Sequence, residues 1–333
     1  MNSPTRSGTN IVTLTMNPAL DITTNTDRVI PTDKLRCGLP RYDPGGGGIN
    51  AARIAHVLGE SVLALFPAGG HTGDKVTDLV AESGVQVQRI PVAHTTRESF
   101  TVDEHRSGKQ YRFVLPGPQL TGAEQTECLK QLSAATGSAD FVVASGSLPP
   151  GVPGDFYQRV ADICRERGAP LILDTSGAGL RHISSGVFLL KPSVRELREC
   201  VERDLVTESA QLAAAHELIE RGCAQFVVVS LGSEGALLAT PHGSQRFSPV
   251  TVPSGSGVGA GDAMVAGITV GLSRGWRLDK AVRLGIAAGA AMLLTPGTAP
   301  CNREDAERLF EMVPEPADVD RDQLLSTQAK ASP

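Results

Sequence analysis

A glycine-rich turn near the carboxyl-terminal end of the chain ends in a carboxylate and runs directly into an apolar segment. Residues 256–262 read Ser-Gly-Val-Gly-Ala-Gly-Asp, and the apolar run Ala263 to Ile268 follows. Glycines let backbone N–H groups converge on an anion, and the start of the following helix carries partial positive charge. A bound phosphate would repel the carboxylate of Asp262. A carboxylate at this position therefore indicates chemistry that needs a proton acceptor beside a phosphoryl group in transfer. The pattern indicates a phosphate cradle with its own base, although a simple capped turn uses the same residue types.

A second glycine run lies near the other end of the chain. Residues 44–50 read Pro-Gly-Gly-Gly-Gly-Ile-Asn and lead into a segment, 51–59, with the helical spacing of apolar residues and a terminal glycine. A flexible linker would also be glycine-rich, but linkers seldom run straight into an amphipathic helix through an asparagine. Consecutive glycines would let a sugar lie against the backbone, with Asn50 reading its hydroxyls. Together the two turns predict a sugar kinase.

Composition and charge argue against several other classes of protein. The chain has 333 residues, of which 41% are hydrophobic, and its net charge of -5 gives no broad attraction to nucleic acid or anionic membrane. The six cysteines lack C-x-x-C spacing and the seven histidines form no H-x-x-x-H pair, so a disulfide framework and a zinc site have little support. No apolar run reaches the roughly 20 residues that cross a bilayer, and residues 1–10 lack the apolar core of a signal peptide. We expect a cytoplasmic protein with small-molecule partners.

Short apolar runs rich in β-branched residues alternate with helical stretches along most of the chain. We expect six buried strands, at residues 11–15, 61–66, 141–144, 171–173, 188–190 and 226–230. This alternation predicts an α/β fold whose mostly parallel sheet is covered by helices on both faces. Ligands of such sheets lie beyond the carboxyl ends of the strands. Four polar side chains follow predicted strands: Asp21, Ser145, Asp174 and Lys191.

Two segments break this alternation. Residues from about 20 to 42 and from about 97 to 115 are polar and show short period-two patterns, such as Gln110 to Val114. We expect them to form exposed strands of a small second sheet, which would be only marginally stable alone. Residues 1–10 and 315–333 are expected to be disordered tails, the second because it is rich in proline and acidic residues. The predicted domain therefore spans residues 11–312.

The chain resembles the ribokinase-like, or phosphofructokinase B, family of carbohydrate kinases over nearly its whole length. The glycine run with Asn50 is similar to the family's amino-terminal signature, and residues 259–262 are similar to its carboxyl-terminal one. Further similar segments occur in the same order: 13–15, 34–37, 66–70, 110–114, 145–152 and 228–232. The resemblance implies a three-layer sandwich with a small β-sheet lid. In this family the lid closes over the sugar and pairs with a second subunit, which implies a homodimer.

The resemblance also implies how phosphoryl transfer is carried out. Asp262 would accept the proton of the sugar hydroxyl. The N–H groups of the preceding three residues would stabilise charge on the transferring phosphate; these residues are Gly259, Ala260 and Gly261.

Segment 191–196, Lys-Pro-Ser-Val-Arg-Glu, resembles the family's K-P-N-x-x-E motif for nucleotide and magnesium. In that motif Lys191 would meet the ATP phosphates, and Glu196 would hold Mg²⁺ through water. Ser193 stands where the family usually has Asn, so either a water replaces the missing amide or activity is reduced. The other implied nucleotide positions are Ser230, Gly232, Gly235, Ile286 and Ala290. Positions implied for a monovalent cation such as K⁺ are Ser256, Val258, Thr295, Gly297 and Ala299.

The implied sugar site lies at the first glycine run and the lid. Its candidate residues are Asp21, Gly46, Gly47, Asn50 and Ser145. A sugar that already carries phosphate needs charged donors, and we expect Arg97 to contact that phosphate. Lys34 would reach the substrate or the nucleotide across the dimer. The cations of the lid could instead serve only to discourage pairing of its edge strands.

The choice of acceptor depends on finer points of the resemblance. Related kinases of fructose 1-phosphate and tagatose 6-phosphate tend to have Gly-Lys-Gly-Ile-Asn where residues 46–50 read Gly-Gly-Gly-Ile-Asn. The missing lysine and the similarity at 110–114 favour fructose 6-phosphate, with fructose 1,6-bisphosphate and ADP as products. The alternatives are a 1-phosphofructokinase or a tagatose-6-phosphate kinase. A non-catalytic sugar-phosphate sensor is the alternative from another class, and Ser193 keeps it open.

Overall fold

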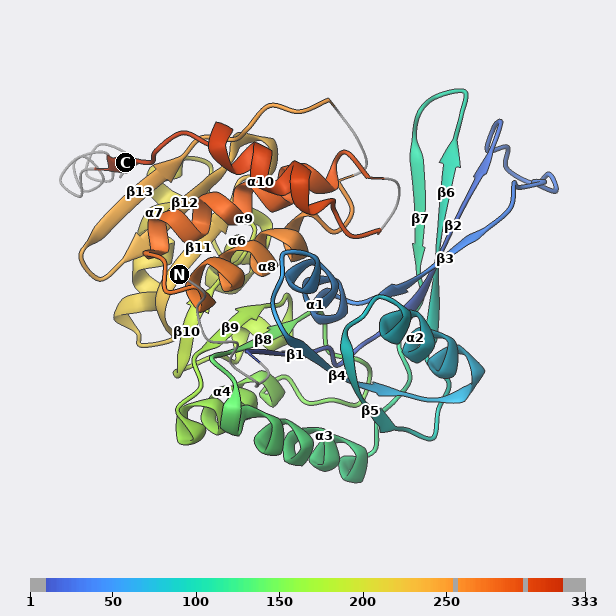
Figure 1. The fold of residues 1–333 in the computed structure, drawn as a ribbon, viewed down its shortest axis with the longest axis horizontal. Coiled ribbons are helices and arrows are strands. Elements are labelled where there is room, and N and C mark those ends of the chain that lie inside the picture. Colours follow the sequence, from blue (N-terminus) through green and yellow to red (C-terminus); the bar gives the residue numbers. More distant parts are fainter. Residues whose placement is uncertain (1–9, 254–256, 296–298, 320–333) are drawn as a thin grey trace, which may run out of the picture.

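One large sheet forms the middle of the computed structural model, which describes residues 10–253, 257–295 and 299–319 (Figure 1). Its strands are β1 (Ile11–Leu14), β4 (Val62–Ala68), β5 (Gln86–Pro91), β8 (Phe141–Ser145), β9 (Leu171–Asp174), β10 (Val187–Leu190), β11 (Ala224–Ser230), β12 (Ala236–Thr240), β13 (Gly243–Phe247) and β14 (Ala317–Val319). Their order is β14-β13-β12-β11-β10-β9-β8-β1-β4-β5. All neighbours from β11 to β5 pair parallel, and β12, β13 and β14 extend the sheet antiparallel. The mostly parallel sheet and the six predicted strands are confirmed.

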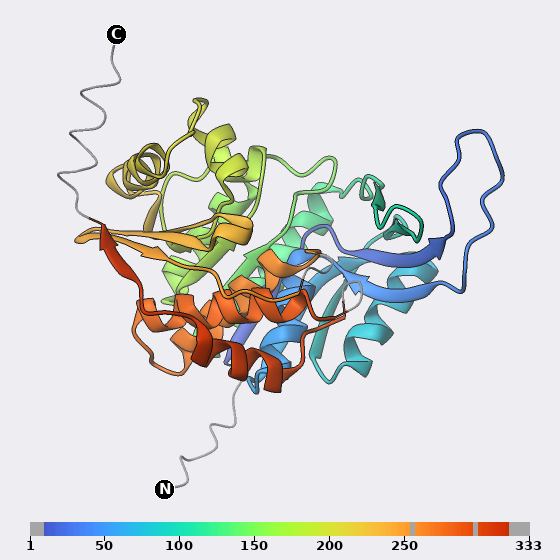
Figure 2. The ribbon, with the colours of Figure 1, turned by 90° about the horizontal axis from the view of Figure 1, so that it is seen from above.

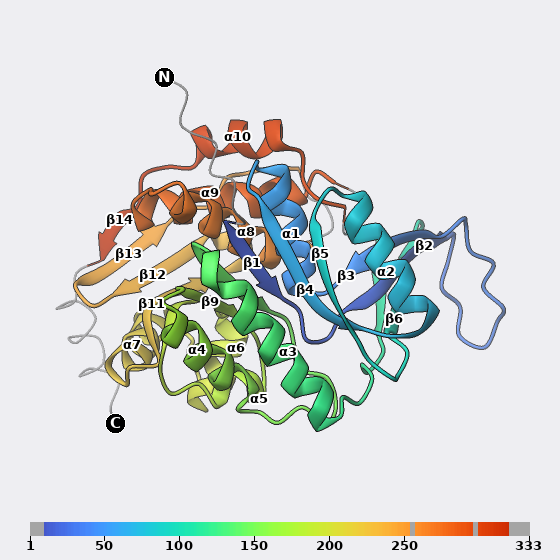
Figure 3. The same cartoon turned by 60° about the horizontal axis from the view of Figure 1, so that its bottom comes forward.

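Helices cover both faces of this sheet (Figure 3). One face carries α1 (Gly47–Val57), α2 (Gly70–Glu82), α8 (Ala260–Ser273), α9 (Leu278–Met292) and α10 (Arg303–Met312). The other carries α3 (Gly122–Ala135), α4 (Phe156–Arg167), α5 (Ala178–Arg181), α6 (Val194–Val201) and α7 (Glu208–Glu220). The central strands contribute to both cores, as in β9, where Ile172 packs on the first face while Leu171 and Leu173 pack on the second. The three-layer sandwich is therefore confirmed.

Helices α8 and α9 pack closely because glycines face each other between them. A Cβ on Gly267 would fall 2.7 Å from the carbonyl oxygen of Leu284, and one on Gly285 would fall 2.7 Å from that of Met264. Close backbone approach of this kind leaves no space for side chains and fixes the position of α8. Most residues of α9 from Leu284 onward are buried.

A smaller sheet stands apart from the sandwich (Figure 1). Its strands are β2 (Ala19–Thr26), β3 (Arg41–Gly45), β6 (Arg97–Glu104) and β7 (Gln110–Val114), in the order β3-β2-β6-β7. Strands β2 and β6 pair parallel, and the two outer pairs are antiparallel. The predicted second sheet is thus present. Residues 27–40, between β2 and β3, form a long loop that projects from the molecule (Figure 2).

The two faces of this lid sheet differ in chemistry. Pairing places Tyr42, Ile22, Phe100 and Phe113 in one row across the four strands, and the three aromatic residues are at least 37% exposed. The neighbouring positions on the same strands point to the opposite face. That second face carries charged side chains: Asp21, Arg41, Asp43, Arg97 and Arg112. The lid therefore has an apolar row on one face and a cluster of charged side chains on the other.

The carboxyl-terminal tail differs from expectation. Ala317–Val319 form strand β14, which pairs with Ser244 to Arg246 of β13. The prediction of disorder from residue 315 is wrong for these residues, because hydrogen bonds to an open sheet edge outweigh their polar composition. Residues 1–9 and 320–333 lie outside the described part of the chain. Within the described ranges, no helix is both long enough and apolar enough to span a bilayer.

Candidate active site

The two glycine-rich turns meet. Asn50, in the first turn of α1, donates a hydrogen bond from Nδ2 to Oδ2 of Asp262, in the first turn of α8, at 2.9 Å. A Cβ on Gly47 would fall 2.3 Å from Oγ of Ser145 and 3.0 Å from Oδ1 of Asp262. The first glycine run, the end of β8 and the start of α8 therefore enclose one space, and Gly47 has no room for a side chain.

Neighbouring strands bring polar residues to this space at their carboxyl ends. Ser145 ends β8, Asp174 ends β9, and Lys191 follows β10 directly. Nζ of Lys191 lies 3.2 Å from Oδ1 of Asp174, and both side chains are largely buried. This placement follows the rule that ligands of parallel sheets bind beyond the strand ends.

The start of α8 has the backbone geometry expected of an anion site. Gly259 immediately precedes the helix with φ of 79°, in the left-handed region that favours glycine. The first N–H groups of a helix carry the positive end of its dipole, so this end can hold an anion beside Asp262. Nζ of Lys191 lies 3.7 Å from the position that a Cβ on Gly261 would occupy. A buried positive charge therefore lies behind the glycines.

The carboxyl of Asp262 is held in an environment that favours proton uptake. Burial is the largest influence and raises its pKa. The hydrogen bond from Asn50, the charge of Lys191, the hydroxyl of Ser145 and the charge of Arg112 all oppose that rise. A carboxyl with raised pKa is a better proton acceptor than an exposed one, so Asp262 has the character of a general base.

The charged face of the lid turns toward the same space. Burial raises the pKa of Asp21 to about 6, the charges of Arg97 and Arg112 lower it, and the carboxylates of Asp43 and Asp262 raise it. A Cβ on Gly45 would fall 2.3 Å from Oδ2 of Asp21. The lid thus adds to the space around Asp262 an acidic group on which two guanidinium charges act.

Arg97 is anchored to the backbone. Its Nη1 donates to the carbonyl oxygen of Leu115 and its Nη2 to that of Asn17, each at 3.1 Å. Burial lowers the pKa of this arginine, and Asp21 opposes that effect. Arg112, by contrast, is exposed. Its charge nevertheless acts on both Asp21 and Asp262.

Buried polar atoms without a hydrogen-bond partner gather around this space. They include Oδ1 of Asn17, Oδ1 of Asn50 and Nε of Arg97. A buried polar group that lacks a partner costs about 1–3 kcal/mol. A polyhydroxylated ligand carries the donors and acceptors that would satisfy these atoms.

On the other side of Gly261 lies a cleft of about 530 Å³. Five of the positions implied for the nucleotide line it. They are Ser230 at the end of β11, Gly232 and Gly235 just after it, and Ile286 and Ala290 on α9. Ala260 and Gly261 line it too, so the start of α8 separates this cleft from the space at Asp262. The cleft is mostly apolar with few polar groups, as small-molecule sites usually are.

The K-P-S-x-x-E segment is arranged differently from expectation. Lys191 is 3% exposed, is paired with Asp174 and does not line the cleft. Ser193 caps α6: its Oγ accepts from the N–H of Glu196, whose Oε2 accepts from the N–H and the hydroxyl of Ser193 at 2.8 Å each. A hollow of about 390 Å³ lies beside Ser193 and shares Ser230 with the larger cleft. The roles of this segment stay predictions.

Other predicted positions are only partly tested by the geometry. Lys34 lies in the exposed loop between β2 and β3, which projects from the molecule (Figure 2). Of the five monovalent-cation positions, Ser256 and Gly297 lie outside the described residues. Oγ1 of Thr295 lies 3.3 Å from the carbonyl oxygen of Ala299. Among the residues that the structure describes, no cluster of three His, Cys, Asp or Glu side chains could hold a metal.

Sequence reasoning did not select Asn17 or Asp43 as site residues. Asn17 donates from Nδ2 to Oγ of Ser147 at 3.2 Å and supports Arg97 through its carbonyl oxygen. Asp43 binds Arg41 at 2.7 Å on the charged face of the lid. Asn17 follows the first predicted strand, and this position was the signal that could have identified it.

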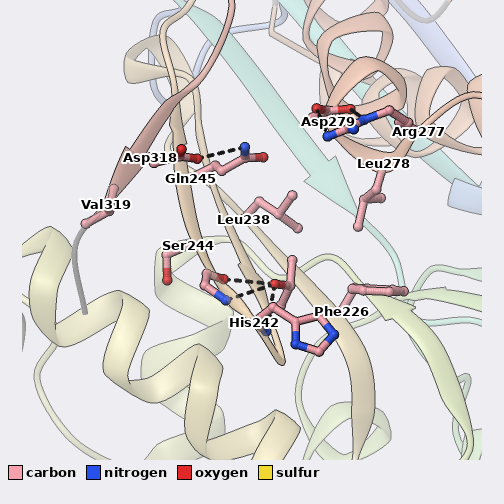
Figure 4. Close-up of a pocket in the computed structure, with 12 residues that line it drawn as sticks. Phe226, Leu238, His242, Ser244, Gln245, Arg277, Leu278, Asp279, Asp318 and Val319 are labelled. Carbon is pink, nitrogen blue, oxygen red and sulfur yellow. Dashed lines mark hydrogen bonds and ion pairs between the residues drawn. The ribbon is translucent and has the colours of Figure 1, made fainter. Parts of the chain in front are cut away.

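A larger hollow, of about 720 Å³, lies away from these residues between α9 and strands β11 to β14 (Figure 4). Its polar groups pair with one another: Gln245 donates to Asp318, and Arg277 binds Asp279. None of the predicted site residues lines it. Its size alone gives no reason to place chemistry there.

Comparison with known proteins identifies close relatives. Residues 14–305 match the family described as pfkB family carbohydrate kinase. The chain is 70% identical over 315 residues to the ATP-dependent 6-phosphofructokinase isozyme 2 of Mycobacterium tuberculosis strain H37Rv, which covers 95% of this chain and 93% of the relative. It is 39% identical over 302 residues to the isozyme of the same name from Escherichia coli K12, covering 90% and 97%. A 1-phosphofructokinase of Xanthomonas campestris is 35% identical over 298 residues, covering 86% and 93%.

Solved structures of phosphofructokinase-2 from Escherichia coli share the fold. The complex with fructose 6-phosphate superposes with a TM-score of 0.86 at 37% identity, covering 92% of this chain and 99% of that chain. The complex with potassium gives 0.87 at 38% identity, and the tetrameric inhibited form gives 0.86 at 38% identity, each covering 91% of this chain and 99% of the other.

Proposed function

Because the chain belongs to the pfkB family of carbohydrate kinases, we propose that it transfers the terminal phosphoryl group of ATP to fructose 6-phosphate, giving fructose 1,6-bisphosphate and ADP. The observation that carries this proposal is the meeting of the two glycine turns, in which Asn50 and Asp262 are joined at 2.9 Å. The high identity to two enzymes named 6-phosphofructokinase supports the choice of acceptor.

The geometry supports a direct transfer with Asp262 as general base. The proton of the acceptor hydroxyl passes to Asp262, the freed oxygen bonds to the γ-phosphorus, and the bond to ADP breaks with its electron pair on the ADP oxygen. Gly259, Ala260 and Gly261 offer N–H groups to the charge that develops on the phosphoryl oxygens. Lys191 adds a positive charge from behind these glycines without contacting the nucleotide cleft.

The cleft of about 530 Å³ is the proposed ATP site. Ile286 and Ala290 of α9 supply an apolar wall for the base, and the small residues Ser230, Gly232 and Gly235 let the nucleotide approach the backbone. The γ-phosphate would lie at the start of α8, because that helix end borders both the cleft and Asp262. The geometry thus matches a nucleotide on one side of the glycines and a sugar on the other.

The chain offers oxygen ligands that suit Mg²⁺ and K⁺. Mg²⁺ is usually held by one or two carboxylates together with phosphates and waters. Glu196, whose charge acts on Asp174 and Lys191, suits it as a single carboxylate. When bound with ATP, Mg²⁺ neutralises phosphate charge. Val258, Thr295 and Ala299 are proposed as part of a K⁺ site, and the potassium complex of the Escherichia coli enzyme supports this assignment.

Phosphosugar binding is proposed on the lid side of Asp262. Asp21, Gly46, Gly47, Asn50 and Ser145 surround the hydroxyl groups. Arg97 and Arg112 supply the cationic partners that a sugar phosphate needs.

We also propose that the protein is a homodimer joined through the lids. The apolar row of Tyr42, Ile22, Phe100 and Phe113 is the surface that such pairing would cover. In the dimer Lys34 of one subunit would approach the site of the other. As a consumer of ATP and phosphosugar, the enzyme is proposed to work in the cytoplasm.

A 1-phosphofructokinase activity is the second candidate, because a relative of that name also covers most of the chain. The test is a coupled assay of ADP release with ATP, Mg²⁺ and, separately, fructose 6-phosphate, fructose 1-phosphate, tagatose 6-phosphate and ribose. We expect the highest kcat/KM with fructose 6-phosphate. The variant Asp262→Asn should lower kcat by several hundredfold or more while nucleotide binding persists, because it removes the base.

Each other outcome of this assay has a definite meaning. A preference for fructose 1-phosphate or tagatose 6-phosphate would replace the acceptor but keep the kinase. Near-normal turnover by Asp262→Asn would refute the role of this residue. Binding of a sugar phosphate, seen as a raised melting temperature, without ADP release would show a sensor in place of an enzyme.

A further inference from the structure

The hydrogen bond between Asn50 and Asp262 has a direction that the chemistry fixes. An ionised carboxylate only accepts, so the amide must present its NH₂ group to Oδ2 of Asp262, as it does at 2.9 Å. The carbonyl oxygen of the same amide, Oδ1 of Asn50, is buried and has no hydrogen-bond partner among the described residues. Asn50 as a whole is 9% exposed. One end of this buried amide is therefore satisfied by the base, and the other is left for a donor.

The two oxygens of Asp262 are not equivalent. Oδ2 receives the amide of Asn50. Oδ1 lies on the side of the glycine run, 3.0 Å from the position of a Cβ on Gly47, and that position is also 2.3 Å from Oγ of Ser145. Oδ1 thus faces the space proposed for the sugar.

Asn50 is held on a rigid element. Its own N–H donates to the carbonyl oxygen of Gly46 at 2.9 Å, and its neighbours Ile49 and Ala51 are fully buried. Helix α1 packs directly against α8. An amide placed in this way can act as a fixed reference for the orientation of a carboxylate on the facing helix.

We propose that Asn50 is a positioning residue for the base: it holds Oδ2 of Asp262 so that Oδ1 faces the acceptor hydroxyl, while its own carbonyl oxygen accepts from a second hydroxyl of the same sugar. The inference rests on the proposed function, because it requires a sugar hydroxyl that gives its proton to Asp262. That O–H bond breaks, the proton moves to Oδ1, the oxygen bonds to the γ-phosphorus, and the electron pair of the broken P–O bond leaves with ADP. Asn50 keeps its bond to Oδ2 throughout.

This arrangement couples binding of the acceptor sugar to the orientation of the Asp262 carboxylate. A residue that only binds sugar would affect KM, whereas one that orients Asp262 must affect kcat at saturating sugar. The same hydrogen bond lowers the pKa of Asp262 against the effect of burial. Loss of the amide must then raise that pKa and move the acid limb of the pH–rate profile to higher pH.

The test compares Asn50→Ala and Asn50→Asp with the wild type at saturating ATP and fructose 6-phosphate. For Asn50→Ala we expect kcat to fall about tenfold or more and the acid limb to rise by about one pH unit. For Asn50→Asp the limb should rise further, because two adjacent carboxylates resist double ionisation. Titration of the Asp262 carboxyl carbon by NMR in sugar-free protein should give the same order of pKa values.

Asn17→Ala is the matched control. Its amide lies in the same site but donates to Ser147 in place of Asp262, so its loss should leave the acid limb where it is, whatever it does to KM. If Asn50→Ala does not fold, Asn50→Ser is measured instead, since the serine hydroxyl is too short to reach Oδ2.

Two results would overturn the inference. One is an Asn50 variant that raises only KM and keeps the wild-type kcat and acid limb. The other is an Asp262 carboxyl that titrates at the same pH with and without the amide. Failure of the proposed function is distinguishable from both, because in that case the wild type itself phosphorylates no phosphosugar, while the NMR titration still reports on the contact.

Discussion

Three carboxyl groups around the proposed site, on Asp21, Asp174 and Asp262, have pKa values above the ordinary aspartate value, and burial is the main cause for each. For Asp174 the value is about 6, even though its partner Lys191 opposes the rise. Ionising such groups in the folded protein costs free energy that the unfolded chain does not incur. Individual site residues therefore reduce stability at neutral pH.

The effect can be measured at Asp21. Its pKa is raised from 3.8 to about 6 in the folded protein, so between these pH values the folded state holds a proton that the unfolded state has released. Stability contributed by the protonated form is complete below about pH 4 and is lost as pH rises to about 6. We expect the unfolding free energy of the wild type, relative to Asp21→Asn, to fall by about 2–3 kcal/mol across this interval.

Urea denaturation of both proteins at several pH values measures this difference. Glu98→Gln is a suitable control, because it removes a carboxylate from the neighbouring strand β6 of the same sheet. A difference between wild type and Asp21→Asn that stays constant from pH 4 to 6 would contradict the assignment.

Residues with a chemical role could be found from sequence where a motif surrounded them. Asp262 and Asn50 follow glycine runs, and the structure brings the two together. Asn17 has no such motif, and its contribution depends on contacts with Arg97 and Ser147, which are far away in the chain. Sequence also could not show that Lys191 would be buried against Asp174, because burial of a charge depends on what packs around it.

At the scale of elements, the start of α6 shows how a local rule can explain a departure from the family motif. Ser193 forms a reciprocal capping box with Glu196. Serine and asparagine are about equally good at this position, whereas alanine is poor. The serine therefore serves helix stability, and the carboxylate oxygen Oε2 of Glu196 is engaged in the same cap.

We expect Ser193→Ala to lower the free energy of unfolding by about 1 kcal/mol and Ser193→Asn to change it by only a few tenths. Chemical denaturation of the three proteins measures this. Turnover at limiting Mg²⁺ is recorded in parallel, because Ser193→Asn restores the amide of the family motif. Equal losses of stability in both variants would show that the cap contributes little.

Strands were predictable where an apolar run was rich in β-branched or aromatic residues, which β12 (Ala-Leu-Leu-Ala-Thr) is not. The six expected strands are buried in the sheet, and their bounds match within two residues. Strands β5, β12, β13 and β14 were not predicted. Strand β5 lies at an edge and reads Gln-Val-Gln-Arg-Ile-Pro, and β14 has only three residues, so neither shows a continuous apolar run. Their formation depends on the neighbouring strand more than on their own composition.

On the scale of the whole molecule, the lid is a single sheet whose two faces differ in chemistry and in proposed function. Its apolar row is exposed in the single chain, while its charged face turns toward Asp262. A four-stranded sheet covered on one side only has little apolar area to bury. Pairing of two lids would supply the missing cover, and it would also bring Lys34 close to a site.

We expect Phe113→Asp to convert the proposed dimer to monomer and to lower turnover at saturating substrates, because a carboxylate in the apolar row would be desolvated on pairing. Sedimentation velocity and the coupled assay measure the two effects. Val206→Asp is the matched control, since Val206 is 88% exposed but lies in the loop between α6 and α7. A Phe113→Asp protein that stays dimeric, or a monomer with full activity, would contradict the proposal.

Alternation of the two lid faces along the same strands has a further consequence for how this protein can change over generations. Gaining or losing one residue within β6 would move every later side chain to the opposite face, exchanging Arg97-type positions with Phe100-type positions. One insertion or deletion in β6 would therefore disrupt both dimer assembly and catalysis. We therefore expect lineages of this enzyme to keep the number of residues in β6 constant.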